Sequence, residues 1–348
     1  MALGVSVIPF ARQKILLAHS NVGDTALRWH ERRRKAAVAL GYDLSVFNMG
    51  DFHPYTIFPR LDKLWRKRDS ALMRLYDALG EAIAGCDVFI HYNGALIHPR
   101  FLEQFDKLTI YHCADDPDAS EVLSRPVARQ YDMCAISNVA CIDMYKSWGC
   151  SNTFFWPIGS YSYIEDEASS DATSKARDIP LVFIGSKLGA TNVRYIGRYL
   201  GMYRKKAFMN KLERAFPDLV AYGSGWSRGW LDDDGIQDVY KRARIGFNVH
   251  NGLGPINGRL YDLAAFGVCQ ICDNKANLSL VFDEGSEIRG FDSVDECIDL
   301  IRYYYAHPLE ADAIAQAGRR RFLRDYQMGP IWTELFANVN RVSSGATV

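Results

Sequence analysis

The 348-residue sequence has no long hydrophobic run and no excess of charge of one sign. No run reaches the roughly 18 apolar residues that a membrane-spanning helix needs. Lysine plus arginine and aspartate plus glutamate number 41 each. The overall charge therefore gives no reason to expect a nucleic acid, an anionic membrane or an acidic substrate as partner. Residues 1–20 also lack the parts of a secretory signal. We expect a cytoplasmic protein with no transmembrane segment.

Cysteines in a disulfide or zinc pattern are also absent. The eight cysteines are scattered, and a chain of this length does not need disulfides to fold. Cys269 and Cys272 form a CxxC, but they lie in the apolar run Val268 to Cys272, with no second pair of cysteines or histidines at zinc spacing. No Asp-x-Asp follows a predicted strand. We predict reduced cysteines, a buried strand at the CxxC, no metal site and no cofactor.

Short repeats and low-complexity segments are missing, and the sequence instead alternates apolar runs of strand length with amphipathic segments of helix length. This alternation is typical of parallel α/β units. The expected strands of the first half are residues 14–18, 43–48, 87–91, 108–112, 133–137 and 152–156. Those of the second half are residues 181–185, 219–223, 245–249, 268–272 and 287–291.

Helices are expected between these strands. Leucines and an isoleucine from Leu61 to Ile83 line one face of what we predict to be a single core helix. In the second half, helices are predicted across residues 195–216, near 237–242 and from about 258 to 266. Two more follow, split by Pro308, and residues 330–342 have the pattern of a last amphipathic helix.

The fold class that we predict is α/β, with two tandem Rossmann-like doubly wound domains facing each other across a cleft. The first domain spans residues 1–163, a polar linker spans 164–180, and the second domain spans 181–325. Residues 326–348 form a separate terminal helix. Because ligands bind at the carboxyl ends of parallel strands, we expect the active site between the two domains.

The segments that follow the strands of the second domain contain many small and polar residues. Backbone N–H groups of such segments can approach a bound anion, and Gly185, Ser186, Gly223 and Asn248 are candidates for this role. Lys187 either contacts a phosphate or is a solvated loop charge. Arg204, Lys205 and Lys206 share a predicted helix, and for at least two of them we expect a solvated face.

The segment after residue 248 has the most informative pattern. Asn257 and Gly258 begin a predicted helix, Arg259 lies in its first turn, and Asp262 follows three residues later. The positive end of a helix next to a guanidinium suits a diphosphate. The same spacing also fits an ordinary N-cap at Asn257 and a surface ion pair of Arg259.

From about Ala243 to Tyr326 the chain resembles the carboxyl-terminal domain of group 1 glycosyltransferases, and within them the spore-maturation CgeB-like branch. The residues that carry this resemblance are ARIGFNVH, GRLYDLAAFGVCQICDN and the run from Leu280 to Tyr326. VFIGS and AYGSGW extend it more weakly to Leu181. In the first domain, the best point of agreement is DDP at Asp115–Pro117.

This resemblance implies a GT-B glycosyltransferase that takes a sugar from a nucleoside diphosphate, and UDP is the nucleotide that we expect. No metal is required if the helix start and Arg259 carry the phosphate charge. The resemblance also implies that the terminal helix returns to the first domain. Asp262, where relatives more often have glutamate, would hold the ribose or the sugar, and Arg259 with the helix start would neutralise the diphosphate. Retaining relatives carry a second acid eight residues earlier, where this chain has Gly254. The anomeric outcome is therefore not inherited.

A glycosyl transfer also needs a base for the acceptor hydroxyl, which we expect in the first domain. Asp24 follows the first strand but can instead cap the next helix. His91 ends a strand, where a core role is the alternative. Asp115 and Asp116 are adjacent, so at most one would face the cleft and the other would cap the next helix.

Two other functions remain open from the sequence. One is a sugar-nucleotide epimerase or phosphorylase on the same fold, and the other is a degenerate nucleotide-sugar-binding module, for which the missing acid at Gly254 is the best support. The acceptor class is also open among a glycan, a lipid-linked sugar, a small molecule and a protein. The basic runs WHERRRKA and AGRRRFL lack the interleaved aromatic residues that single-stranded nucleic acid needs, so we expect no nucleic acid partner.

Overall fold

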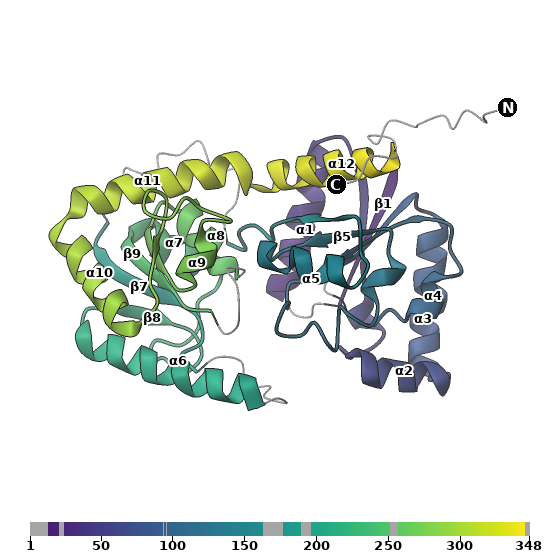
Figure 1. Ribbon diagram of the computed structural model, residues 1–348, viewed down its shortest axis with the longest axis horizontal. Coiled ribbons are helices and arrows are strands. Elements are labelled where there is room, and N and C mark those ends of the chain that lie inside the picture. The colour runs from purple at the N-terminus through teal and green to yellow at the C-terminus, as the bar shows by residue number, and fades with distance from the viewer. Residues whose placement is uncertain are drawn as a thin grey trace. The chain divides into compact units, whose positions relative to one another are not determined.

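The computed structural model describes residues 13–20, 24–92, 94, 96–162, 177–188, 196–250 and 257–344. The chain forms two compact units, one made of Met1–Pro157 with Met328–Val348 and the other of Ile158–Gln327. The first unit thus ends six residues before the boundary predicted at residue 163. Most of the predicted linker, residues 163–176, lies outside the described residues. Figure 1 labels the elements of each unit.

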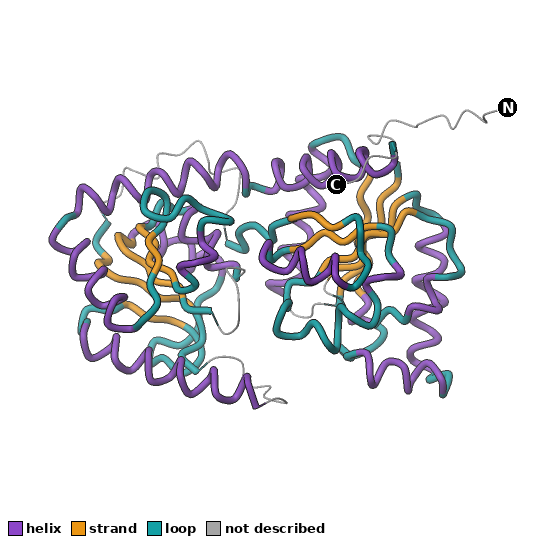
Figure 2. Tube along the Cα trace, viewed as in Figure 1, coloured by secondary structure: helices purple, strands orange, loops and turns teal. Residues whose placement is uncertain are grey.

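The first unit is built on six parallel strands (Figure 2). Its strands are β1 (Lys14–His19), β2 (Asp43–Asn48), β3 (Val88–Tyr92), β4 (Leu108–His112), β5 (Met133–Ile136) and β6 (Thr153–Phe155). Their order in the sheet is β2-β1-β3-β4-β5-β6. The direction of the winding across the sheet therefore reverses between β1 and β3, which is the topological switch point of a doubly wound fold. All six strands predicted for this half are confirmed.

Six α-helices lie among the described residues of this unit. They are α1 (Asp24–Ala39), α2 (Phe58–Arg66), α3 (Ser70–Ala84), α4 (Pro99–Leu102), α5 (Ile142–Ser147) and α12 (Met328–Ser343). Three short 3-10 turns accompany them, η2 (Met49–Asp51), η3 (Ala128–Gln130) and η4 (Val139–Cys141).

The single core helix predicted from Leu61 to Ile83 is wrong, because the structure has two helices there. Arg68 adopts a left-handed conformation with φ of 50°. The Asp69 side chain then caps α3 by accepting the N–H groups of Ala71 and Leu72 at 3.1 Å. The break falls inside the longest gap in the apolar spacing. Residues of both helices bury against the same core, so the face was predicted correctly but the helix end was not.

Helix α12 contacts α1 and packs on the first unit through two buried tryptophans. Trp332 Nε1 donates to the Arg33 carbonyl at 3.0 Å, and Trp156 Nε1 donates to the Ile331 carbonyl at 3.1 Å. The buried Arg33 guanidinium lies 4.5 to 5.6 Å from the ring centroids of Trp156, Tyr92, Trp29 and Trp332. Such cation–π contacts offset part of the cost of burying the charge.

The second unit has a five-stranded parallel sheet in the order β11-β10-β9-β7-β8. The strands are β7 (Ile179–Ile184), β8 (Val220–Tyr222), β9 (Ala243–Asn248), β10 (Cys269–Cys272) and β11 (Arg289–Gly290). The direction of the winding reverses between β7 and β9, so the switch point of this unit lies there. The five strands predicted for this half are confirmed.

The helices of the second unit are also those expected from the sequence, with one short addition. They are α6 (Ile196–Ala215), α7 (Asp233–Arg242), α8 (Gly258–Ala265), α9 (Lys275–Leu278), α10 (Val294–Ala306) and α11 (Pro308–Asp325). Pro308 begins α11, as a proline at the first helical position can. Arg177 joins the end of the predicted linker to the sheet by donating to the Ala243 and Phe266 carbonyls.

All eight cysteines are buried and free. Cys269 and Cys272 lie in β10, as predicted for a buried strand.

Among the described helices, none combines the length and the apolar character that crossing a bilayer requires.

Candidate functional site

The segments that follow β7 and β8 are hydrogen-bonded to each other. Lys187 N donates to the Ser224 carbonyl at 2.8 Å, and Trp226 Nε1 donates to the Gly185 carbonyl at 2.9 Å. Ser186 Oγ accepts the Leu188 N–H at 3.3 Å. These contacts fix the loops at the carboxyl edge of the sheet, where the sequence predicts an anion site.

Lys187 is not a solvated loop charge, and its contact with a phosphate stays a prediction. Its ammonium forms an ion pair with Glu213 at 2.6 Å and lies 4.6 Å from the centroid of the Trp226 ring. The side chain is 16% exposed, so it is neither a solvated loop charge nor a cation without a partner.

Asn248, at the end of β9, is joined to the start of α8 by a pair of reciprocal hydrogen bonds. Its Nδ2 donates to Asn257 Oδ1 at 3.0 Å, and Asn257 Nδ2 donates to Asn248 Oδ1 at 2.8 Å. Asn257 Oδ1 also accepts the Leu260 N–H, so this residue is the N-cap of α8. The two predicted residues are therefore brought together, and they hold the helix start against the strand end.

Arg259 reaches from α8 across the switch point of the sheet. Its Nε donates to the Ile184 carbonyl at the end of β7 at 2.7 Å, and its Nη1 donates to Asn248 Oδ1 at 2.8 Å. Its Cζ lies 4.4 Å from the centroid of Phe183. A Cβ on Gly185 would meet Arg259 Nη2 at 2.0 Å, so the guanidinium passes directly over this glycine.

The electrostatic position of Arg259 is unusual. Among the residues that the structure describes, none offers it a carboxylate within ion-pair distance. Burial lowers the pKa of the guanidinium, and the more distant charges of Asp262 and Asp273 act against that shift. A buried cation without a paired anion is costly, and an anionic ligand would remove this cost.

Lys205 is a second buried cation at the same edge, and the sequence analysis missed it. Its side chain is 6% exposed, and its Nζ lies 5.9 Å from the centroid of Phe183, the ring on which Arg259 stacks. Burial, and then the charge of Arg259, lower the pKa of Lys205 to about 7.

A signal for Lys205 was present in the sequence. Lys205, Met209, Leu212 and Phe216 are spaced by four, three and four residues, which puts them on one helical face, and all four are buried. Lys206 is exposed, as expected for a solvated face, and nothing is described of the Arg204 side chain.

Asp262, which was predicted to bind the ribose or the sugar of the donor, is hydrogen-bonded to other residues of the chain. Its Oδ1 accepts hydrogen bonds from Ser160 Oγ at 2.5 Å, Tyr161 N at 3.0 Å and Ser162 N at 3.2 Å. Burial raises the pKa of this carboxyl group to about 6, although the hydrogen bonds oppose the rise. These contacts give Asp262 a structural role, that of holding residues 160–162 to α8. Its role toward a ligand stays a prediction.

Gly258 permits another close contact at the start of α8. A Cβ there would meet Tyr161 Cδ2 at 1.9 Å, so the tyrosine ring covers this glycine. The segment that contacts Asp262 therefore also lies against the first residue of the helix.

Gly223, the remaining residue predicted to bind the sugar nucleotide, has φ of 117°, and a Cβ on it would meet the Gly185 carbonyl oxygen at 2.6 Å. This glycine lets the exits of β7 and β8 approach each other.

One histidine, with an aspartate that it contacts, also lies at the carboxyl ends of β9 and β10. His250, Cys272 and Asp273 form a group whose possible metal-ligand atoms lie within 4.8 Å of one another. Both oxygens of Asp273 already accept hydrogen bonds from His250, and burial raises the pKa of the Cys272 thiol well above its usual value. A neutral thiol and an occupied carboxylate are poor ligands, so this donor set fits a metal badly.

In the first unit, two of the four candidate bases are enclosed in the core. His91 is fully buried, and its Nδ1 lies 2.6 Å from the Tyr131 hydroxyl. Asp116 is also buried, and its Oδ2 accepts hydrogen bonds from Ser124 Oγ at 2.6 Å and from the Tyr145 hydroxyl. Burial raises the pKa of this carboxyl group to about 6. Both residues have the surroundings of core residues.

Of the two other candidates for the base, Asp115 lies at the surface, and the side chain of Asp24 is not described. Asp115 is exposed, so it and Asp116 do have the opposite orientations that the sequence predicts. The helix that one of them was expected to cap does not form, because turns follow Pro117. Asp24 begins α1, and nothing is described of its side chain. Gly254 also lies outside the described residues.

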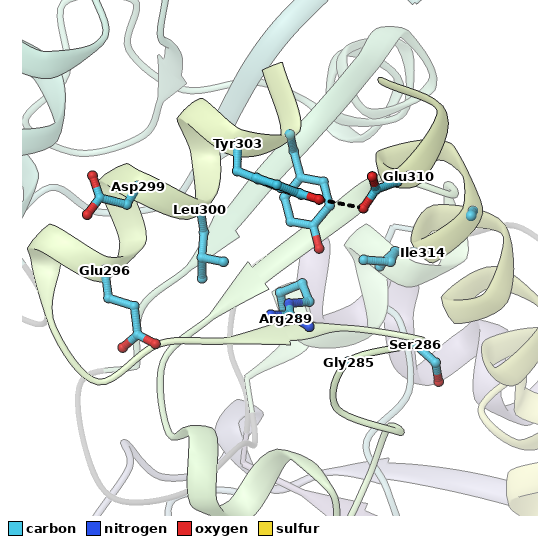
Figure 3. Close-up of a pocket in the computed structure, with 11 residues that line it drawn as sticks. Gly285, Ser286, Arg289, Glu296, Asp299, Leu300, Tyr303, Glu310 and Ile314 are labelled. Carbon is cyan, nitrogen blue, oxygen red and sulfur yellow. Dashed lines mark hydrogen bonds between the residues drawn. The ribbon is translucent and has the colours of Figure 1, made fainter. Parts of the chain in front are cut away.

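A cavity of about 830 Å³ lies elsewhere in the second unit, between α10, α11 and the residues that precede β11 (Figure 3). Its lining contains the guanidinium of Arg289 and the carboxylates of Glu296, Asp299 and Glu310. Tyr303, which Figure 3 shows beside Glu310, donates to that carboxylate at 2.8 Å. Three carboxylates against one guanidinium disfavour a diphosphate, so we place the candidate site at the carboxyl ends of β7, β9 and β10 instead.

Comparison with known proteins found similarity in the second half of the chain and in the fold. A family model described as Glycosyl transferase-like matches residues 204–337, which is less than half of the chain. No curated protein matches the chain.

Solved structures share the fold over almost the whole chain at low sequence identity. Sucrose-phosphate synthase from Thermosynechococcus elongatus is 13% identical with a TM-score of 0.62, and 96% of this chain and 100% of that chain are covered. Anabaena HepE, solved in complex with UDP and glucose, is 11% identical with a TM-score of 0.60, and 94% and 100% are covered. An alpha-glucosyltransferase in complex with UDP and a 13-mer DNA is 12% identical with a TM-score of 0.59, with the same coverage.

These structures confirm the predicted α/β fold of two Rossmann-like domains, which is the GT-B fold. The cleft expected between the domains stays a prediction. The solved structures show the fold alone, and the family match over residues 204–337 supports the assignment of this chain as a glycosyltransferase.

Proposed function

We propose that this chain transfers a sugar from a nucleoside diphosphate, with UDP as the nucleotide, to an acceptor held by the first domain. The observation that carries the proposal is the pair of buried cations at the switch point of the second sheet. Arg259 and Lys205 lie against one aromatic ring, and Arg259 has no carboxylate partner among the described residues. Two buried positive charges at the carboxyl ends of parallel strands suit a diphosphate.

The start of α8 adds a third positive element. Asn257 caps the helix through the Leu260 N–H, and the positive end of the helix dipole lies beside the Asn248–Arg259 contact. Together these groups would stabilise the nucleoside diphosphate as it leaves with the electron pair of the bond between the anomeric carbon and the phosphate oxygen. In this proposal the two side chains and the helix carry the phosphate charge, so no metal and no cofactor is needed.

Two further parts of the proposal rest on similarity. UDP as the nucleotide is supported by the relatives that were solved with UDP bound. Membership of the CgeB-like branch is supported by the run from Ala243 to Tyr326. The base would come from the first domain, where Asp24 and Asp115 remain open after His91 and Asp116 are found in the core.

Binding measurements on Arg259 variants test the donor site. Arg259→Met keeps an aliphatic chain against Phe183 but removes the charge. We expect UDP to bind at least about 30-fold more weakly, because truncating a buried charged contact typically costs 2 kcal/mol or more. Isothermal titration calorimetry would measure this. Arg302→Ala is the matched control, since Arg302 is 62% exposed on α10. Equal affinity of Arg259→Met and the unaltered chain would overturn this placement of the diphosphate.

An activity assay separates transfer from the alternatives. We expect UDP release from UDP-sugars to need an acceptor supplied by a cell extract. Donor turnover without any acceptor would favour an epimerase or a phosphorylase. UDP binding without turnover under either condition would favour a binding module.

A further inference from the structure

His250 is held by one carboxylate in a fixed orientation beside the proposed donor site. Its backbone N–H donates to Asp273 Oδ2 at 2.8 Å, and its ring Nδ1 lies 2.5 Å from Asp273 Oδ1. The two residues follow β9 and β10, whose ends pair in the sheet through Asn248 and Cys272. The charge of Asp273 acts on both Arg259 and Lys205, so the pair lies within electrostatic reach of the two cations.

This contact assigns the tautomer of the ring. An ionised carboxylate can only accept hydrogen bonds, so the ring proton belongs on Nδ1. Nε2 of the neutral ring is then an acceptor, and Asp273 fixes its direction, as an aspartate does for a catalytic histidine.

Nε2 itself has no hydrogen-bond partner in the part of the chain that the structure describes. The side chain is 4% exposed, and Nε2 is a buried atom. Buried side-chain nitrogens in folded proteins nearly always have a partner, and an unsatisfied one calls for a ligand or a water molecule. The chain thus places an unfilled acceptor at the edge where we expect a sugar nucleotide.

Asp262 was expected to accept the hydroxyl groups of the donor, but its Oδ1 already accepts three hydrogen bonds from residues 160–162. We propose that His250, positioned by Asp273, accepts a hydrogen bond from a hydroxyl group of the bound nucleoside diphosphate sugar through Nε2. The hydroxyl belongs to the sugar or to the ribose. This inference rests on the proposed function, because it concerns the same donor.

Calorimetric titrations of the full chain with UDP and with UDP-glucose test the role of His250. We expect His250→Phe to bind the ligand that carries the hydroxyl about 5- to 10-fold more weakly, which is the effect of one lost hydrogen bond. If His250→Phe binds UDP-glucose more weakly but UDP with unchanged affinity, the hydroxyl belongs to the sugar. If it binds both more weakly but 2′,3′-dideoxy-UDP with unchanged affinity, the hydroxyl belongs to the ribose. His307→Phe is the control, since His307 is exposed on another segment.

Asp273→Asn tests the positioning role separately. Asn has one acceptor oxygen where Asp273 accepts two donors, and only the imidazole can respond, by moving its proton to Nε2. Nε2 would then be a donor. We expect the same loss of affinity as in His250→Phe, together with a shift of the ring proton from Nδ1 to Nε2 in long-range proton–nitrogen NMR spectra.

The outcomes separate this inference from the proposed function. If the unaltered chain binds neither UDP nor UDP-glucose, the donor proposal falls and this one falls with it. If it binds them and both variants bind equally well, only the role of His250 is overturned. A rise in melting temperature with Zn²⁺ alone, lost in His250→Phe, would assign the group to a metal and also overturn it.

Discussion

At the scale of single residues, the site depends on two cations that share one aromatic ring. Arg259 and Lys205 lie 4.4 and 5.9 Å from the centroid of Phe183, measured from Cζ and Nζ. Cation–π contact offsets part of the desolvation cost of each. Their mutual repulsion is one cause of the lowered pKa of Lys205. The site therefore has one cation that stays charged and one that titrates near neutral pH.

The titration of Lys205 predicts that donor affinity depends on pH. Its pKa in the free protein is about 7, lowered first by burial. A diphosphate favours the charged ammonium, so Lys205 must take up a proton on binding above this pH. We expect UDP-glucose to bind more weakly as the pH rises from 6 to 9, with a limit of tenfold per unit for one proton. Calorimetry in buffers of different ionisation enthalpy would detect the proton uptake.

Lys205→Arg provides the control for this pH dependence, because a guanidinium stays charged throughout the range. Its affinity should be nearly flat with pH if the variant retains binding. A wild-type affinity that does not change between pH 6 and 9 would contradict the role of Lys205.

The sequence predicted some of these residues and not others, for physical reasons. Asn257 and Arg259 were predicted because a cap and a first-turn cation are local features of one helix start. Lys205 was missed because a run of three basic residues is typical of a solvated surface, and only its spacing from Met209 and Leu212 indicates burial. The contacts of Asp262 join residues about 100 positions apart, and no local pattern encodes such a pairing.

At the scale of elements, strands were easier to predict than helix ends. The buried strands are apolar on both faces, as in β1, where five of six residues are buried. The end of α2 depends on one residue with positive φ and on a capping aspartate, inside a pattern that keeps the same apolar face. Periodicity shows which face is buried, but not where a helix stops when the next one continues that face.

The anchoring of α12 predicts a large effect of one tryptophan. Trp332 is fully buried against Trp156 and Phe336, and its indole N–H bonds to the Arg33 carbonyl. We expect Trp332→Ala to lower the free energy of unfolding of the first unit by about 3–5 kcal/mol, the usual range for a buried tryptophan. Thermal or denaturant unfolding followed by circular dichroism would measure it.

Trp230→Ala is the matched control, because Trp230 is 77% exposed. Its loss should change stability by no more than about 0.5 kcal/mol. Equal changes in the free energy of unfolding for the two substitutions would contradict the role of α12 in the packing of the first unit.

At the scale of the whole molecule, the described residues include two hydrophobic core clusters that share no residue, one in each unit. One core involves residues from Leu16 to Cys150 and the other residues from Leu181 to Ala315. Every residue that we propose to contact the donor belongs to the second unit. The first unit contributes a sheet of its own, the helix α12 packed against α1, and the remaining candidates for the base.

This division predicts how a ligand changes the unfolding of the protein. Because each unit has its own core, we expect calorimetry to show two unfolding transitions, and Trp332→Ala to identify that of the first unit by lowering it alone. UDP should then raise only the other transition, since a ligand stabilises the folded unit that binds it by about 2.7 kcal/mol at 100 times its dissociation constant. Arg259→Met should reduce this shift by about two thirds or more, because a site that binds UDP about 30-fold more weakly is far from saturated at the same UDP concentration. If UDP raised the transition that Trp332→Ala lowers, and left the other unchanged, the nucleotide would bind to the first unit and the donor site would have to be moved there.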